Sequence, residues 1–201
     1  MARSLDELVA LIAELPGVGP RQARRIAQFL LHKNKSFATK LAEHLKSLHD
    51  HIAQCTRCFR FDDVDQSKLC SLCAGTARDV SQLVVVEKDV DVEGIEDAGL
   101  YRGRYFVLGS LMPLNPTRKA FISPRTAELA ALIKKESSLT EVILAFATTP
   151  EGDYTAREVK KLLNEKYPKL TVSMLGRGLS LGAEIEYADH ETLRNAFTGR
   201  K

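Results

Sequence analysis

Four cysteines in two closely spaced pairs constrain this chain more than any other feature. The pairs are Cys55-Thr-Arg-Cys58 and Cys70-Ser-Leu-Cys73, with eleven residues between them. Two such CxxC knuckles can place four thiolates at the corners of a tetrahedron, about 2.3 Å from a zinc ion. Four thiolates leave no coordination position open, so we expect one structural Zn²⁺ per chain. Buried free cysteines and a redox-active CxxC are the alternatives.

The segment around these cysteines, residues 53–80, contains little apolar material. A segment with so small a core needs another source of stability, and zinc binding contributes on the order of 10 kcal/mol or more in zinc-finger peptides. Paired cysteines in a chain without a secretion signal also favour metal binding over a disulfide framework. We therefore expect residues 53–79 to form a small zinc-binding module.

The hydropathy of the chain predicts neither secretion nor membrane insertion. No window approaches the roughly 18 to 20 consecutive apolar residues of a membrane helix, and the N-terminus has a polar, helical pattern instead of a signal core. The formal net charge of +3 over 201 residues is only mildly basic. We expect a cytoplasmic protein with no membrane partner.

The first quarter of the chain has a helical pattern throughout. Apolar residues recur at helical spacing, with Ser4 as the expected N-cap of the first helix and Pro20 in the first turn of the second. The expected helices cover residues 4–15, 20–33 and 36–52. Residues 1–52 should therefore form an all-helical region.

The turn between the first two predicted helices, Leu15-Pro-Gly-Val-Gly-Pro-Arg-Gln-Ala-Arg-Arg-Ile26, looks like a helix-hairpin-helix motif. Gly17 and Gly19 let the backbone turn tightly, and the amides that start the second helix can then hold a phosphate. Arg21, Arg24 and Arg25 would add charge-assisted contacts to the DNA backbone. An ordinary helical hairpin with a solvated basic face is the alternative; the apolar frame and the arginines favour DNA.

After residue 80 the apolar pattern changes to short strands that alternate with helices. The expected strands cover residues 83–87, 104–109, 141–147 and 170–175, and the expected helices cover residues 91–98, 124–136 and 154–166. This alternation predicts an α/β fold with a mostly parallel sheet flanked by helices on both faces. The stretch IEYAD at 185–189 and a helix from about His190 should close the chain.

Acidic residues follow two of the predicted strands. Glu87 ends the strand LVVVE, and Glu151-Gly-Asp153 follows the strand EVILAFA after a short loop. In a parallel sheet both sets would lie at the carboxyl edge, where they could hold Mg²⁺. This arrangement resembles the Toprim domain of topoisomerases and primases. Helix caps and solvated loops are the alternative, because acids at strand ends often serve as either.

The order of these motifs resembles the RecR family of bacterial recombination mediators over the whole chain. The resemblance is carried by LPGVGPRQARRIAQFLL at 15–31, both CxxC pairs, VVVE with Asp91-Val92, YRGRYFVLG at 101–109 and GLSLGAEIEYADHETL at 178–193. It implies four parts: a helix-hairpin-helix DNA-binding region at 1–52, a zinc module at 53–79, a Toprim domain at 80–175, and a C-terminal Walker B-like segment and helix at 176–201.

The resemblance implies a bacterial protein without catalytic activity of its own. RecR proteins assemble as ring-like dimers or tetramers that bind single-stranded, double-stranded and gapped DNA without reading its sequence. They bind RecO and RecF, and help to load RecA onto single-stranded DNA coated with SSB at gaps. This chain would then be a recombination mediator in DNA repair.

The resemblance also assigns roles to single positions. Arg21 and Arg25 match the DNA-contacting positions of the family. The acids Glu87, Asp91, Glu151 and Asp153 match positions associated with partner binding rather than strand cleavage, so any Mg²⁺ bound there would not be catalytic. Glu184, Glu186 and Asp189 match a Walker B-like stretch used in subunit exchange. The loop MPLNPTRKAFISP at 112–124 departs from the family pattern.

Two other functions stay open at this point. The first is a Mg²⁺-dependent Toprim nuclease or primase-like enzyme that acts through Glu87, Glu151 and Asp153. A cleaving Toprim enzyme usually completes its acidic triad with a DxD motif, whereas this chain has ExD. The second is a zinc-ribbon interaction module that does not bind DNA.

Overall fold

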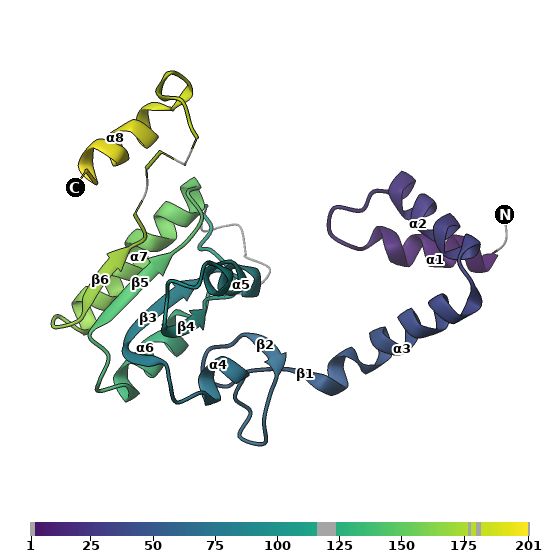
Figure 1. The fold of residues 1–201 in the computed structure, drawn as a ribbon, viewed down its shortest axis with the longest axis horizontal. Helices are drawn as coiled ribbons and strands as arrows, with labels where there is room; N and C mark the ends of the chain where they lie inside the picture. The colour runs from purple at the N-terminus through teal and green to yellow at the C-terminus, as the bar shows by residue number, and fades with distance from the viewer. Residues whose placement is uncertain (1–2, 116–123, 177, 180–181, 201) are drawn as a thin grey trace. The chain divides into compact units, whose positions relative to one another are not determined.

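The computed structural model describes residues 3–115, 124–176, 178–179 and 182–200. The chain divides into two compact units, Met1–Ile52 and Ala53–Lys201 (Figure 1). Residues 116–123, which belong to the divergent loop at 112–124, lie outside the described residues, as do residues 177, 180 and 181. In the described ranges no helix is long and apolar enough to cross a membrane.

The first unit consists of three helices, α1 (Arg3–Ala13), α2 (Pro20–His32) and α3 (Lys35–His51). Helix α1 starts before Ser4, so the expected N-cap role of Ser4 is wrong. Helices α1 and α2 pack on Ile12, Ala23 and Ala27, where the two alanines let the helices approach closely. The cap of α3 is Asn34, whose side chain accepts a hydrogen bond from the Phe37 amide at 2.9 Å.

The second unit is built on a four-stranded parallel sheet, as the alternation of strands and helices predicts. The strands are β3 (Asp79–Val86), β4 (Gly103–Val107), β5 (Glu141–Ala145) and β6 (Thr171–Met174), in the order β4-β3-β5-β6. The central residue Val85 pairs with Phe106 on one side and with Leu144 on the other. The α/β fold class is therefore confirmed.

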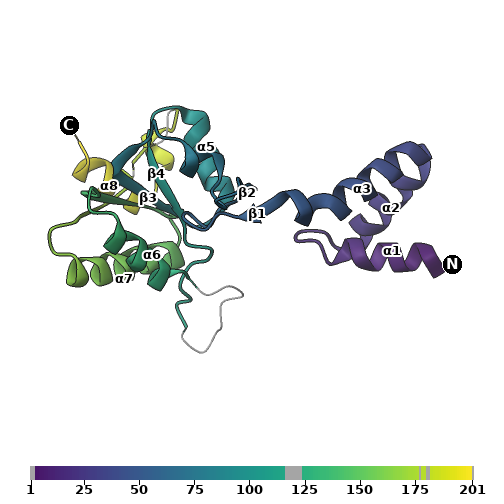
Figure 2. The same cartoon turned by 90° about the horizontal axis from the view of Figure 1, so that it is seen from below.

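Helices α5 (Asp89–Ala98), α6 (Thr126–Lys135) and α7 (Pro150–Lys166) cover the two faces of this sheet. Figure 2 shows α6 and α7 on one side of the sheet and α5 on the other. Alternate residues of β3 divide between two cores, with Val85 facing α6 and α7 and Val84 facing α5. The chain closes with a short 3₁₀ turn (Ile185–Tyr187) and helix α8 (His190–Thr198).

A half-buried polar cluster connects the start of β3 with α5 and β4. Arg78 pairs with Glu96 and donates to the Gly103 carbonyl at 2.9 Å, while the Tyr105 hydroxyl donates to Glu96 at 2.5 Å. Burial opposes ionisation of Glu96, but the hydrogen bonds from Arg78 and Tyr105 outweigh it and hold the pKa of this carboxyl below its usual value.

We expect the Glu96→Gln variant to be less stable than the unmodified chain at neutral pH by on the order of 1 kcal/mol. A folded-state pKa below the unfolded one contributes its full stability above the unfolded pKa of about 4.3, and this contribution is lost as pH falls through the folded-state pKa. The stability difference should therefore shrink as pH falls below about 4. Urea unfolding across this range checks the prediction, with Asp97→Asn as the exposed neighbouring control. A difference that persists in acid would contradict it.

Candidate functional site

The four cysteine sulfurs form one buried cluster. All four lie within 4.8 Å of one another, and the Sγ atoms of Cys58 and Cys70 are 3.6 Å apart. A tetrahedral site with bonds of about 2.3 Å separates its sulfurs by about 3.8 Å, so the cluster has the size that one metal ion requires. The prediction that the two CxxC pairs converge on a single site is met by this geometry.

Each cysteine pair lies on a tight turn that is held by local backbone hydrogen bonds. In the first knuckle the Cys55 amide donates to the Arg60 carbonyl at 2.8 Å, and Phe59 donates back to Cys55 at 3.0 Å. This turn requires Phe59 to adopt a positive φ of 63°. The second knuckle opens helix α4 (Ser71–Ala74), where the Cys73 amide donates to the Cys70 carbonyl at 3.0 Å.

Crowding of the thiols couples their ionisation. Hydrogen bonding from the Cys58 side chain lowers the pKa of Cys55, and hydrogen bonding to Cys55 raises the pKa of Cys58. The four sulfurs therefore resist full deprotonation by themselves, because four thiolates would repel one another in a buried space. A divalent cation would compensate this repulsion, and its binding would release protons.

The first knuckle also covers the outer edge of the sheet. The amide of Val107, on the edge strand β4, donates to the Cys58 carbonyl at 2.8 Å. The Phe59 ring packs edge-on against the Phe106 ring, with their centroids 5.4 Å apart, and the Arg125 guanidinium lies over the Phe59 ring, 5.3 Å from its centroid. The cysteine cluster is thus coupled to the sheet by backbone and side-chain contacts.

In the hairpin of the first unit, Gly17 and Gly19 differ in backbone conformation. Gly17 has a φ of +77°, which only glycine adopts easily, whereas Gly19 is extended at φ −79°, so the turn does not require a glycine there. The predicted turn role is therefore correct for Gly17 and wrong for Gly19. Gly19 is the N-cap of α2 and provides no side chain to cap it.

The start of α2 presents donors and cations to solvent. Because Pro20 has no amide hydrogen and the Ala23 amide already donates to Gly19 at 2.9 Å, the amides of Arg21 and Gln22 are those that lack an intrahelical acceptor. The three predicted arginines, Arg21, Arg24 and Arg25, are all exposed. The arrangement is chemically suited to an anion such as a phosphate.

The predicted acids lie at the carboxyl edge of the sheet, in three short segments. Glu87 directly follows β3, where its side chain is 17% exposed and lies 3.3 Å from the Lys88 ammonium. Asp91, in the first turn of α5, accepts a hydrogen bond from the Lys88 amide at 2.9 Å. Glu151 and Asp153 lie in the first turn of α7.

Gly152 lies between Glu151 and Asp153, at a point where the backbone leaves no room for a side chain. A Cβ atom at this position would collide with the Ala147 carbonyl oxygen. Thr149 caps the helix by accepting from the Gly152 amide at 3.1 Å. In the part of the chain that the structure describes, only the cysteines bring three or more potential ligands within 4.8 Å. The four acids share an edge without forming such a group.

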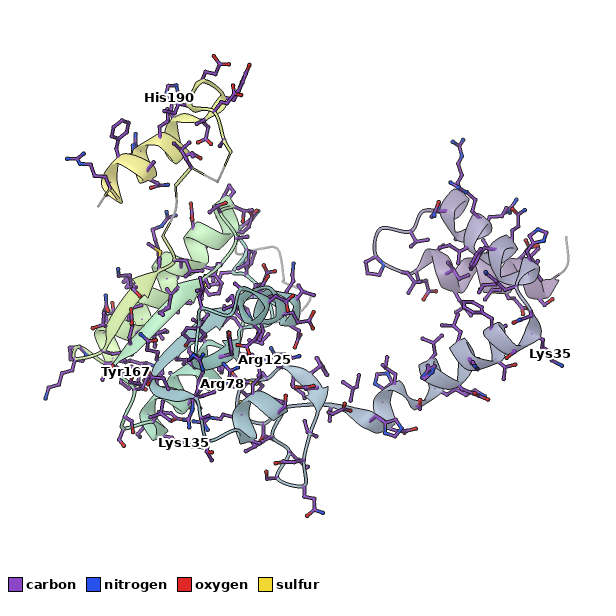
Figure 3. The ribbon with its side chains drawn as sticks, in the orientation of Figure 1. Lys35, Arg78, Arg125, Lys135, Tyr167 and His190 are labelled. Carbon is purple, nitrogen blue, oxygen red and sulfur yellow. The ribbon has the colours of Figure 1, made fainter. Side chains whose placement is uncertain are left out.

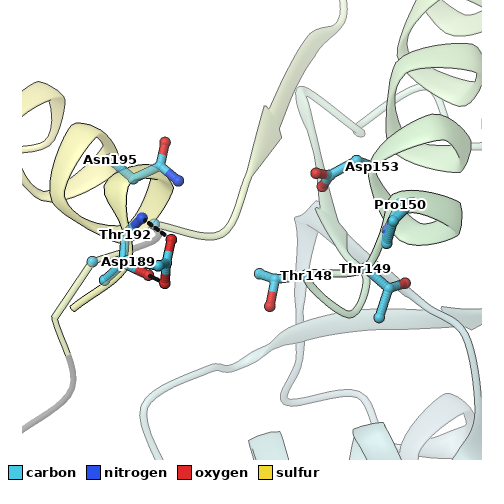
Figure 4. Close-up of a pocket in the computed structure, with 9 residues that line it drawn as sticks. Thr148, Thr149, Pro150, Asp153, Asp189, Thr192 and Asn195 are labelled. Atoms are coloured by element: carbon cyan, nitrogen blue, oxygen red, sulfur yellow. Dashed lines mark hydrogen bonds between the residues drawn. The ribbon is translucent and has the colours of Figure 1, made fainter. Parts of the chain in front are cut away.

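An open hollow of about 570 Å³ separates the start of α7 from the C-terminal segment. Asp153 lies on one side of it and Asp189 on the other, as Figure 4 shows. Asp189 caps α8, with its carboxylate accepting from the Thr192 amide at 2.9 Å and the Thr192 hydroxyl at 2.6 Å. These two hydrogen bonds are those of a helix cap.

Comparison with known families gives a match along most of the chain. A RecR helix-hairpin-helix model matches residues 5–49, a Toprim model matches residues 81–175, and a RecR C-terminal model matches residues 178–201. Recombination protein RecR of Pseudomonas putida is 41% identical over 98% of this chain and 95% of its own length. The chain belongs to the RecR family. RecR of Syntrophobacter fumaroxidans is 37% identical, over 98% of this chain and 94% of its own length.

Membership of the RecR family confirms the resemblance drawn from the motifs and gives the chain a role in recombination and repair. The relatives are named as recombination proteins and not as enzymes. The cysteine cluster lies between the stretches matched by the RecR hairpin model and the Toprim model.

Sequence reasoning missed a second link between this RecR chain's cysteine knuckle and its Toprim domain. Arg57, inside the first CxxC, pairs with Glu136 at the end of α6, and Arg104 of β4 donates to the same carboxylate at 2.8 Å. Arg57 and Glu136 are 79 positions apart in the chain. No local pattern could have found this pair; the only signal was an arginine between two cysteines.

Proposed function

We propose that this chain is a non-enzymatic recombination mediator. As an oligomeric ring or clamp it binds single-stranded, double-stranded and gapped DNA without sequence preference, and with RecO and RecF it helps to load RecA onto SSB-coated single strands at gaps. The proposed DNA binding rests on the start of α2, where backbone amides without a side-chain cap lie beside three exposed arginines. Phosphate contacts of this kind grip the DNA backbone and do not read bases.

Helix α3 supports the proposal that several copies assemble. None of its residues is buried, although Phe37, Leu41, Leu45 and Leu48 recur at helical spacing and are between 40% and 62% exposed. Among the described residues of its own unit, the Phe29 ring contacts Phe37, but the side chains of the stripe stay at least 40% exposed, which is the pattern of a helix that packs against another copy. Assembly would place several mildly basic hairpins on one DNA molecule and raise affinity through avidity.

The metal of the cysteine cluster is, in this proposal, zinc with a structural role. Four buried cysteines close a tetrahedron and leave no position for a substrate. Zinc would hold the knuckle in the form that covers β4. The acids Glu87, Asp91, Glu151 and Asp153 would serve as a partner-binding edge for RecO or RecF.

A Toprim nuclease or primase-like enzyme is the second candidate, because the Toprim model matches residues 81–175. It would require Glu87, Glu151 and Asp153 to gather around Mg²⁺. Incubation of gapped DNA with the protein and Mg²⁺ distinguishes the two candidates. Intact DNA supports the mediator, whereas nicked or extended DNA, lost in Glu87→Gln, would favour the enzyme.

The DNA contacts are tested by the Arg21→Ala, Arg25→Ala variant. Each lost phosphate contact should lower the slope of log affinity against log salt by about 0.7 to 0.9, and the loss should be the same for different DNA sequences. Fluorescence anisotropy with a labelled oligonucleotide measures this slope at several salt concentrations. The matched control is Lys40→Ala, Lys46→Ala on α3, which removes the same charge from exposed positions of the same unit. Equal slopes in the two variants would exclude the hairpin as the DNA site.

A further inference from the structure

A second candidate binding site lies at the edge of the sheet opposite the acids. There, helices α6 and α7 end and strand β6 begins, around a crevice of about 390 Å³. Ile133, Leu139, Tyr167 and Leu170 form its apolar part, and Lys166 and Lys169 lie in its lining as well. A volume of this size lies within the range of small binding pockets in proteins.

The walls of the crevice are fixed by hydrogen bonds. The Tyr167 hydroxyl donates to the Ala130 carbonyl of α6 at 2.7 Å, which joins α7 to α6 through the ring. The Leu170 amide donates to the Tyr167 carbonyl at 2.9 Å. Figure 3 labels Tyr167 and, at the end of α6, Lys135. Because the ring and the turn after it are already held in place, a ligand would not have to order them on binding.

The surroundings of the crevice are positively charged. Lys166 and Lys169 are exposed, and the last turn of α6 adds Lys134 and Lys135 next to Ile133. The acids near the crevice include Glu165, which is exposed, and Glu136, which is engaged by two arginines. Glu141, at the start of β5, accepts hydrogen bonds from Gln82 and Ser173.

Leu139 connects the crevice with that arginine pair. It lines both the crevice and the small neighbouring cavity of Arg57, Arg104 and Glu136. Two guanidinium groups around one carboxylate leave that side with a net positive charge. Lysines at helix C-termini are common because they complement the helix dipole, but the dipole does not account for an apolar hollow between them.

We propose that this crevice binds an acidic peptide segment of a partner protein, which inserts one bulky apolar side chain. The side chain would pack on Leu139, Tyr167 and Leu170, while acidic neighbours in the peptide meet Lys166 and Lys169. A nucleic acid would use the lysines but has no aliphatic side chain for the hollow, so the combination favours a peptide. The site is independent of the hairpin and leaves the acidic edge free for another partner.

The test uses the full chain and a fluorescein-labelled peptide, Glu-Asp-Asp-Leu-Phe. Anisotropy should show saturable binding that weakens with salt and weakens by about tenfold or more when alanines replace Leu and Phe. The Lys166→Glu, Lys169→Glu variant should lose about tenfold or more in affinity for the peptide. The matched control, Arg157→Glu, Lys161→Glu, makes the same charge change at exposed positions of α7 outside the crevice, and it should bind like the unmodified chain.

Three results would overturn the proposal. The first is no saturable binding up to about 1 mM peptide. The second is equal weakening by the two charge-reversal variants, which would make the attraction a general charge effect. The third is binding that does not depend on Leu and Phe and is displaced by a single-stranded oligonucleotide, which would make the surface a nucleic-acid contact. DNA binding by the Lys166→Glu, Lys169→Glu variant, measured in parallel, separates this proposal from the hairpin.

Discussion

Replacing Cys58 with serine is expected to lower the metal content from about one ion per chain to near zero and to lower the thermal midpoint of the second unit by about 10 °C or more. The knuckle has little apolar core of its own, so metal binding is its main source of folding free energy. Its loss should free the Cys58 carbonyl from the Val107 amide and the Phe59 ring from Phe106. The effect should therefore reach the sheet.

Metal analysis and calorimetry on the same sample measure both quantities. The control is Ser71→Ala, which changes an exposed residue of the second knuckle that is not a ligand. This variant should keep its metal and its thermal midpoint. A Cys58→Ser protein that retains one zinc per chain would refute the four-sulfur site. A metal-free protein with an unchanged midpoint would refute the coupling between the knuckle and the sheet.

The Leu41→Glu, Leu48→Glu variant is expected to separate the assembly into smaller species and to weaken apparent DNA affinity by about a hundredfold or more. Both side chains lie in the exposed stripe of α3, at 40% and 45% exposure. If assembly buries this stripe, a glutamate there would lose its hydration, which is costly. Helix α3 buries none of its residues, so the first unit should still fold. Light scattering gives the mass, and anisotropy with gapped DNA gives the affinity.

The matched control is Thr39→Glu, Ala42→Glu, which adds the same charge at exposed positions of α3 outside the stripe. It should keep both the mass and the affinity of the unmodified chain. If the stripe variant stays assembled, α3 is not the interface. If it dissociates but binds DNA as tightly as before, avidity does not contribute to affinity.

Much of the fold could be predicted because its signals are local. The cysteine spacing predicted one converging cluster, and the strand and helix patterns predicted each element of the sheet. Element ends were less predictable, since they depend on caps. Helix α7 starts at Pro150, four residues before the expected start, because Thr149 caps it. Strand β4 stops at Val107, two residues before Gly109, whose φ of +91° breaks the extended chain.

The sequence by itself determined the α/β fold, the family and the candidate residues for metal and phosphate binding, because these are recorded in short motifs and in the order of the motifs along the chain. Only the tertiary structure decided how these parts are joined. Arg57 meets Glu136 and Arg104, Cys58 covers β4 through Val107, and the lysine-lined crevice forms where two helices end. These contacts join residues far apart in the chain, and they exist only after the helices pack on the sheet, so no periodicity or spacing in the sequence encodes them.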